Sequence, residues 1–195
     1  MKPDRIDSDR TYFVADHHFG HEGVIRMSKR PFASVDEMDR YMIQAWNDVV
    51  RADCHVWHLG DFAHRADRGR AGKIFAKLNG IKHLVRGNHD PDWLATKEFG
   101  WASVDDRKVL NAGGQLIVLD HYPSREWVGW WNGSLQLHGH THNNLPSSSR
   151  SFDVGVDALG YVPATIHEIR ARMAQLPNLD FRHGVEVDWL VAPRE

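Results

Sequence analysis

Five short apolar segments, each followed within three residues by histidine, aspartate or asparagine, constrain the fold of this chain most strongly. They are rich in β-branched, aliphatic and aromatic residues and are bounded by glycine or polar residues, a pattern typical of buried β-strands. Strands of this kind with helical segments between them, in a chain of 195 residues, predict a layered α/β fold. The predicted strands cover residues 11–15, 55–59, 83–85, 116–119 and 135–137.

The polar clusters that follow these strands are predicted to meet at one place. In open α/β sheets, ligands bind beyond the carboxyl ends of the strands, so several strand ends contribute to one site. We therefore expect the five clusters to converge. In chain order they are Asp16-His17-His18, Gly60-Asp61, Gly87-Asn88-His89-Asp90, His121 and Gly139-His140-Thr141-His142.

The spacing within the clusters favours this convergence. Residues two apart leave an extended chain on the same side, so we expect Asp16 and His18 to point together, with His17 turned away. The same spacing pairs His140 with His142. Glycine comes just before the key residue in three clusters, where the missing side chain lets the backbone bend close to an ion.

The candidate ligands are oxygen and nitrogen donors without a thiolate, which disfavours a structural zinc site of the cysteine type. Such donors suit Mn, Fe, Zn, Ni or Mg, and of these metals Mn is the one that we expect. Seven donors exceed the needs of one first-row ion, so we expect two divalent ions that share a carboxylate and a hydroxide. A centre of this kind keeps a positive charge that attracts phosphate esters. The donors are Asp16, His18, Asp61, Asn88, His121, His140 and His142.

The ordered pattern D-x-H, G-D, G-N-H-[DE], H and G-H-x-H resembles that of the calcineurin-like metallophosphoesterases. All five elements occur between residues 16 and 142, and each follows a predicted strand. The shorter strings RPF at residues 30–32 and VGVD at residues 154–157 resemble a short bacterial and phage branch of that family. The resemblance implies a four-layer α-β-β-α sandwich with two mixed β-sheets.

The resemblance also implies a role for each candidate. His89 would be the catalytic histidine, oriented by Asp90. The chain departs from the family at His17, which is bulky between two ligands, and at Phe62-Ala63-His64, where related groups often carry another polar pair. Asp16, His18 and His142 would hold the first ion, Asn88, His121 and His140 the second, and Asp61 would bridge both.

The expected reaction is hydrolysis of a phosphomonoester or phosphodiester by attack of a metal-bridging hydroxide. His89 would donate a proton to the leaving alkoxide, and Asp90 would favour the protonated ring. The alternative is a catalytically silent scaffold of the same fold that binds other proteins. Such a scaffold is expected to have lost ligands or the catalytic histidine, and this chain has all of them.

Helical patterns lie between and after the strands. Ser34 with Glu37 opens a core-facing helix, and Thr165 with Glu168 opens another that ends at Pro177. Two more helices are predicted over residues 70–78 and 91–99. Early alternation of strands and helices predicts parallel pairing, and the helix-poor stretch 109–156 predicts hairpins and antiparallel pairing. We expect one domain over residues 1–195 without a cap domain.

Several other side chains near the clusters have both a structural and a functional interpretation. The histidines could support the ligands or contact substrate. The tryptophans could stack a base or a sugar, although packing is the favoured interpretation. The arginines could grip a phosphate or lie solvated at the surface. These residues are His17, His21 and His64, then Trp127, Trp130 and Trp131, and Arg30, Arg86 and Arg125.

Charge and cysteine content limit the expected partners and location. Lys and Arg number 24 against 26 Asp and Glu, a net charge of −2, which argues against strong binding of duplex nucleic acid or a membrane surface. We expect a small phosphate ester as substrate, nucleotide-like esters included. The single Cys54 and a start, MKPDRIDSDR, without an apolar segment favour a cytoplasmic protein. The oligomeric state stays open.

Overall fold

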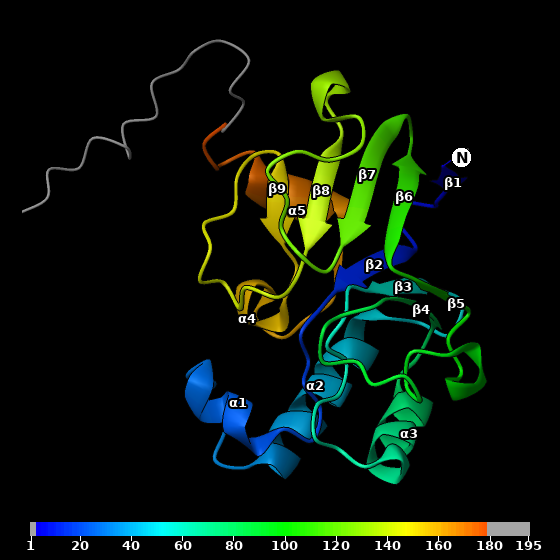
Figure 1. The fold of residues 1–195 in the computed structure, drawn as a ribbon, viewed down its shortest axis with the longest axis vertical. Coiled ribbons are helices and arrows are strands. Elements are labelled where there is room, and N and C mark those ends of the chain that lie inside the picture. Colours follow the sequence, from blue (N-terminus) through cyan, green and yellow to red (C-terminus); the bar gives the residue numbers. More distant parts are fainter. Residues whose placement is uncertain (1–2, 179–195) are drawn as a thin grey trace, which may run out of the picture.

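Two five-stranded sheets form the centre of the molecule in the computed structural model, which describes residues 3–178 (Figure 1). One sheet has the order β1-β6-β7-β8-β9 and the other the order β10-β2-β3-β4-β5. The strands are β1 Asp4–Arg5, β2 Thr11–Val14, β3 His55–His58, β4 Ile81–Val85, β5 Ser103–Asp105, β6 Arg107–Ala112, β7 Gln115–Asp120, β8 Leu135–His138, β9 Ser151–Asp153 and β10 Ala164–Thr165.

Both sheets are mixed. In the second sheet, β2, β3, β4 and β5 pair in parallel, and β10 joins β2 in the antiparallel direction. In the first sheet, β6 and β7 are antiparallel, whereas β1, β8 and β9 join in parallel. The predicted α/β class with two mixed sheets is confirmed, and all five predicted strands are present.

Helices cover the outer sides of the sheets and enclose a shared core. Helices α2 and α3 lie beside each other below the β3-β4 part of the second sheet (Figure 1). Helix α5 packs against β2, β9 and β10. Buried side chains from both sheets, such as Phe13, Leu84, Ile117 and Leu137, belong to one continuous hydrophobic cluster. The helices are α1 Glu22–Met27, α2 Val35–Val49, α3 Arg68–Lys77, α4 Val156–Leu159 and α5 Ile166–Met173.

Capping side chains decide where helices α2, α3 and α5 begin. The Ser34 hydroxyl accepts a hydrogen bond from the Glu37 backbone N–H at the start of α2. Thr165 and Glu168 form the full predicted capping box of α5. Helix α3 begins at Arg68, earlier than predicted, because the Asp67 carboxylate caps it. Within residues 3–178, no helix combines the length and apolar character that a membrane crossing requires.

The predicted helix over residues 91–99 is wrong. The segment forms a single turn after Pro91, whose carbonyl accepts hydrogen bonds from Leu94 and Ala95, and then the short 3-10 helix η1 Lys97–Phe99. Thr96 has extended backbone, and its side chain caps η1 from outside. A residue with a short polar side chain that bonds to the backbone competes with helix propagation, and here it divides the segment.

The prediction of antiparallel pairing over residues 109–156 holds only for the β6-β7 hairpin. Strands β7, β8 and β9 run parallel to one another. Parallel neighbours need a long crossover, and residues 121–134 with the 3-10 helix η2 Trp130–Asn132 provide one without an α-helix. The carboxyl ends of β7 and β8 therefore lie at the same edge of their sheet.

The apolar face of α2 generates a stability prediction. Met42 is fully buried in the shared core, whereas Arg40 on the same helix is exposed. We expect Met42→Ala to lower the free energy of unfolding by about 2–5 kcal/mol because it leaves a cavity. Arg40→Ala should stay within about 0.5 kcal/mol of the wild type. Urea unfolding followed by circular dichroism measures both, and equal losses would contradict the packing described.

Candidate metal centre

Backbone pairing continues beyond the ends of β2 and β3 and brings their polar clusters together. The Asp16 N–H donates to the Gly60 carbonyl at 3.0 Å, and the His18 N–H donates to the Asp61 carbonyl at 3.0 Å. From the other sheet, the Gly139 N–H donates to the His121 carbonyl at 3.1 Å. The predicted convergence of strand ends is therefore seen in the backbone itself.

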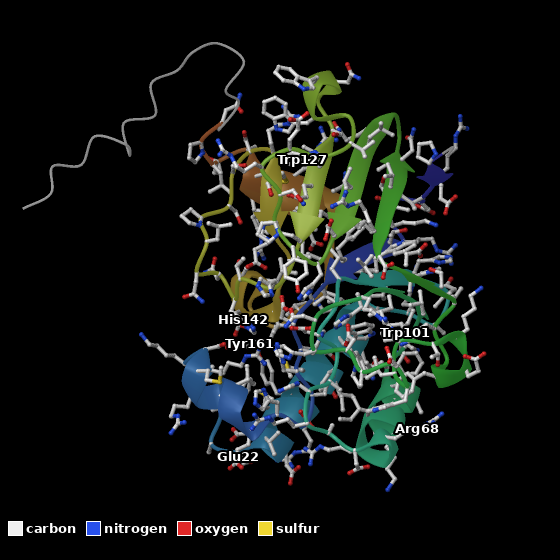
Figure 2. All side chains as sticks on the ribbon, in the orientation of Figure 1. Glu22, Arg68, Trp101, Trp127, His142 and Tyr161 are labelled. Carbon is white, nitrogen blue, oxygen red and sulfur yellow. The ribbon has the colours of Figure 1, made fainter. Side chains whose placement is uncertain are left out.

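The donor atoms of these residues form two overlapping groups within 4.8 Å. One group contains Asp16, His18 and His142, and the other contains Asp16, Asp61 and His121. His142 lies at the lower end of the first sheet, where α4 approaches α1 (Figure 2). Asp16 belongs to both groups, so the two groups form one continuous centre.

Asp61 and Asn88 connect the remaining candidates to this centre. One oxygen of Asp61, Oδ2, lies 3.4 Å from His18 Nε2 and 3.6 Å from His121 Nε2. Asn88 Oδ1 lies 2.9 Å from His121 Nε2 and 3.0 Å from His140 Nδ1. All seven predicted ligands are therefore near neighbours, and Asp61 has a central position among them.

Left-handed backbone places five of the seven side chains. The φ angles are 59° at Asp16, 52° at His18, 57° at Asp61, 69° at His140 and 48° at His142. This conformation costs roughly 1–2 kcal/mol per residue for side chains other than glycine. The prediction that residues 16–18 are extended is therefore wrong. Asp16 and His18 nevertheless lie together in one group of donors, as predicted. Such strain is typical of functional sites.

Glycines allow the strand ends to touch. Gly60 has φ of +91°, and a Cβ there would lie 2.6 Å from Gly87 Cα and 2.6 Å from His121 Nδ1. A Cβ on Gly139 would lie 2.5 Å from Asp16 Oδ2. Any side chain at these positions would push the donors apart, which explains the glycines that precede the clusters.

Burial gives the centre the electrostatic character of an ion site. Burial, with the charge of Asp61 second, raises the pKa of Asp16 well above its usual range. Burial also lowers the pKa of His18, with the His142 charge adding to the effect. Asp16 Oδ1 and both ring nitrogens of His18 are buried without a hydrogen-bond partner. Neutral imidazole is the form of His18 that binds a divalent cation, and the buried Asp16 carboxylate requires a compensating positive charge to stay ionised, so the donor set fits a cation.

Asp90 has contacts that the sequence does not reveal. Its Oδ2 accepts hydrogen bonds from the backbone N–H of Asp61 and Gly87, at 2.9 and 2.8 Å, and its Oδ1 accepts one from Phe62 at 2.9 Å. These bonds hold the 87–90 loop against the end of β3. The ring of His89 is exposed and lies against His64, with centroids 4.2 Å apart. Orientation of His89 by Asp90 stays a prediction.

Comparison with known proteins places the chain in a family. No protein-family model matches it. A curated relative from Methanocaldococcus jannaschii, the uncharacterized protein MJ1445, is 30% identical over 165 residues, 80% of this chain and 87% of the relative. The chain belongs to the MJ1445 family.

Solved structures extend the comparison. That of AQ665 from Aquifex aeolicus, a protein of unknown function, has a TM-score of 0.68 at 25% identity, over 83% of this chain and 98% of that one. An archaeal phosphodiesterase is less similar, with 18% identity, a TM-score of 0.46 and coverage of 74% and 81%. The second likeness is too distant to support an argument about activity.

In this member of the MJ1445 family, a buried ion pair lies next to the centre and bonds to its backbone and to one of its histidines. The Arg30 guanidinium donates to both oxygens of Asp157 at 2.8 and 2.9 Å, and to the carbonyls of Asp16 and His17 at 2.7 and 2.8 Å. Asp157 Oδ2 lies 2.7 Å from His142 Nδ1. Neither predicted role of Arg30, phosphate binding or a solvated surface, is correct.

The charge state of Asp157 follows from the same contacts. Burial acts to raise its pKa, but hydrogen bonds from His142 and Arg30 outweigh burial and lower it. Asp157 thus stays ionised and orients the His142 ring, as carboxylates do behind metal-ligating histidines. The strings RPF and VGVD, far apart in sequence, meet through this pair.

The other candidates divide into those at the centre and those away from it. His21 and His64 lie at the centre, with ring centroids 4.6 Å apart, whereas His17 is buried and stacks on Phe19.

Trp127 and Trp130 are buried in a small cluster with Val118, and Trp131 is 59% exposed. Trp127 lies far from His142 (Figure 2). Arg86 pairs with Asp92 at 3.1 Å, and Arg125 is exposed.

Breaking the Arg30 pair should destabilise the protein strongly. Arg30→Met leaves two buried backbone carbonyls without this donor and leaves Asp157 with only His142 as its partner. We therefore expect a loss of about 3–5 kcal/mol in the free energy of unfolding. Arg86→Met removes an exposed pair and should cost less than about 1 kcal/mol. Urea unfolding of the metal-free protein measures both variants. Similar losses for the two would show that Arg30 does not have the supporting role described.

Proposed function

We propose that this chain is a metal-dependent phosphoester hydrolase that cleaves phosphomonoester or phosphodiester bonds. The observation that carries the proposal is the convergence of buried oxygen and nitrogen donors, several without another partner, at one set of strand ends. The proposed site would hold two divalent ions, with Mn as the expected element, and Asp61 would help to hold both. The first would be held by Asp16, His18 and His142, and the second by Asn88, His121 and His140.

Bound divalent ions would supply the charge that neutralises phosphoryl oxygens and would lower the pKa of water. The chain contributes the geometry. The Asp61 carboxylate lies between His18 and His121, and its Oδ1 accepts a hydrogen bond from the His89 N–H at 2.8 Å. The bond places His89 next to the donors while its exposed ring faces solvent, where a substrate would arrive.

His89 is the proposed proton donor. Its ring lies 5.6 Å from that of His18 and 4.2 Å from that of His64, centroid to centroid. In hydrolysis, the oxygen of water forms a new bond to phosphorus, the bond to the leaving oxygen breaks, and the His89 ring gives that oxygen a proton. Asp90 holds the loop that carries His89 through its three backbone bonds.

A catalytically silent scaffold explains the centre less well. A surface that only binds proteins gains nothing from left-handed backbone at five donors or from buried donor atoms without partners. Both features cost stability, and both serve the binding of a cation. No specific observation favours the scaffold over hydrolysis.

Metal content tests the dinuclear proposal. After loading with Mn and removal of free ion, the protein should contain about two equivalents per chain, measured by elemental analysis. Asp61→Ala should lose more metal than Asn88→Ala, because Asp61 is proposed to contact both ions and to offset their repulsion. A content that saturates at one equivalent, or an Asp61→Ala variant with wild-type content, would reject the dinuclear arrangement.

Leaving-group dependence tests the role of His89. His89→Ala should keep its metals and lower the rate on esters with alkoxide leaving groups by about 10²–10⁴. The loss on p-nitrophenyl esters should be much smaller, because p-nitrophenolate needs little protonation. His167→Ala, which removes an exposed histidine on α5, serves as the control. Equal losses on both ester types at equal metal content would assign His89 to phosphate binding instead.

A further inference from the structure

A groove opens beside His89, on the side away from most of the proposed ligands. Its volume is about 420 Å³, and its walls are residues 63–66 from the segment after β3 and residues 88–91 with Trp93 from the segment after β4. Of the seven proposed ligands, only Asn88 lines it. The groove is therefore continuous with the proposed centre but extends beyond it.

The walls of the groove combine a cation with aromatic rings. Arg65 is exposed and has φ of 59°, a left-handed turn at the groove wall. Trp93 is partly buried, and its ring lies 5.8 Å from Phe99, centroid to centroid, which holds one side of the indole. His64 also lines the groove, with its ring 4.2 Å from that of His89, centroid to centroid.

The acidic residues nearby leave little negative charge in the groove. Asp90 is buried and has both carboxylate oxygens bonded to backbone N–H groups. The side chain of Asp92 is 98% exposed and pairs with Arg86. A ligand in the groove would therefore meet a guanidinium and an indole, the pair of groups that bind phosphate and a nucleobase.

We propose that this groove is the leaving-group subsite and that it binds a nucleotide. The inference rests on the proposed function: if His89 protonates the leaving oxygen, the group attached to that oxygen lies at the mouth of the groove. The base would stack on Trp93, and the next phosphate would pair with Arg65. Ligand sites of roughly 300–1,000 Å³ hold molecules of this size, so the groove has room for one nucleoside but not for a duplex.

The substrate class follows from this placement. The bond that breaks joins phosphorus to a nucleoside oxygen, so the substrate is a phosphodiester within a short single strand or dinucleotide. Water supplies the oxygen that phosphorus gains, and His89 supplies the proton that the nucleoside oxygen takes. The products are a nucleoside or nucleotide with a free hydroxyl and a phosphomonoester.

Direct binding tests the subsite without turnover. Calorimetry on the metal-free protein would use adenosine 5′-monophosphate as the probe and inorganic phosphate as its control. Trp93→Leu keeps apolar bulk against Phe99 but removes the ring face, so nucleotide affinity should fall about tenfold while phosphate affinity stays unchanged. Trp93→Phe keeps a ring and should restore most of the affinity.

Arg65→Gln and Arg68→Gln form a matched pair. Both residues are exposed, but only Arg65 lines the groove. Arg65→Gln should weaken binding of the nucleotide about tenfold and Arg68→Gln should not change it. In the Mn-loaded enzyme, KM for a deoxyadenosine dinucleotide should rise in Trp93→Leu and in Arg65→Gln, and should stay unchanged in Arg68→Gln.

The outcomes separate this inference from the proposed function. Nucleotide binding that is absent in the wild type, or equal in the wild type, Trp93→Leu and Arg65→Gln, overturns the subsite. If the subsite is overturned in this way, hydrolysis of bis-p-nitrophenyl phosphate by the Mn-loaded wild type still supports the proposed phosphoesterase activity. Selective loss of nucleotide binding in the two groove variants supports the groove as a nucleotide site. Failure of the loaded wild type on every ester would then reject the hydrolase and the leaving-group role of the groove, but not nucleotide binding.

Discussion

The candidate site depends on hydrogen bonding between two chain segments that have already left their sheet. The segment after β2 follows the segment after β3 from Asp16 to Phe19, with the Phe19 N–H donating to the Phe62 carbonyl at 3.0 Å. Asp90 then bonds the Asp61 and Phe62 amides to the Gly87 loop. Three strand ends are thereby held at fixed distances by backbone N–H and carbonyl groups together with the Asp90 carboxylate. The side chains at these positions are free to serve as donors.

The residues of this centre make the folded protein less stable than other residues at the same positions would. Five donors have left-handed backbone, Asp16 is a buried carboxylate, and atoms of Asp16 and His18 have no partner. The buried Arg30 offsets part of this cost, because it satisfies the carbonyls of Asp16 and His17 and keeps Asp157 ionised. A cation would offset more. The distribution of strain and of support thus agrees with a site that is completed by binding an ion.

Sequence reasoning succeeded where the signal was local. The five strands and the proximity of the seven candidate ligands could be predicted because each candidate lies within a few residues of the end of an apolar strand, and parallel strands end at the same edge. It failed where one distant residue decides the outcome. Nothing near Arg30 in the chain indicates that Asp157 will pair with it, and nothing in residues 87–90 shows that Asp90 will bond to the amides after β3. The crossover between β7 and β8 also has no helical pattern, so parallel pairing there could not be predicted.

The sequence separation of these contacts has a consequence for biosynthesis. Asp16 is among the first residues made, yet the His140 N–H that donates to it and the Val154 carbonyl that pairs with Ala15 come well over a hundred residues later. Asp157, the partner of Arg30, comes later still. A nascent chain on the ribosome therefore carries the early donors without their neighbours until residues near 157 have emerged. Assembly of the candidate centre is thus a late event in synthesis, and a chain truncated before α4 would contain all seven candidate ligands but not Asp157, which contacts Arg30 and His142.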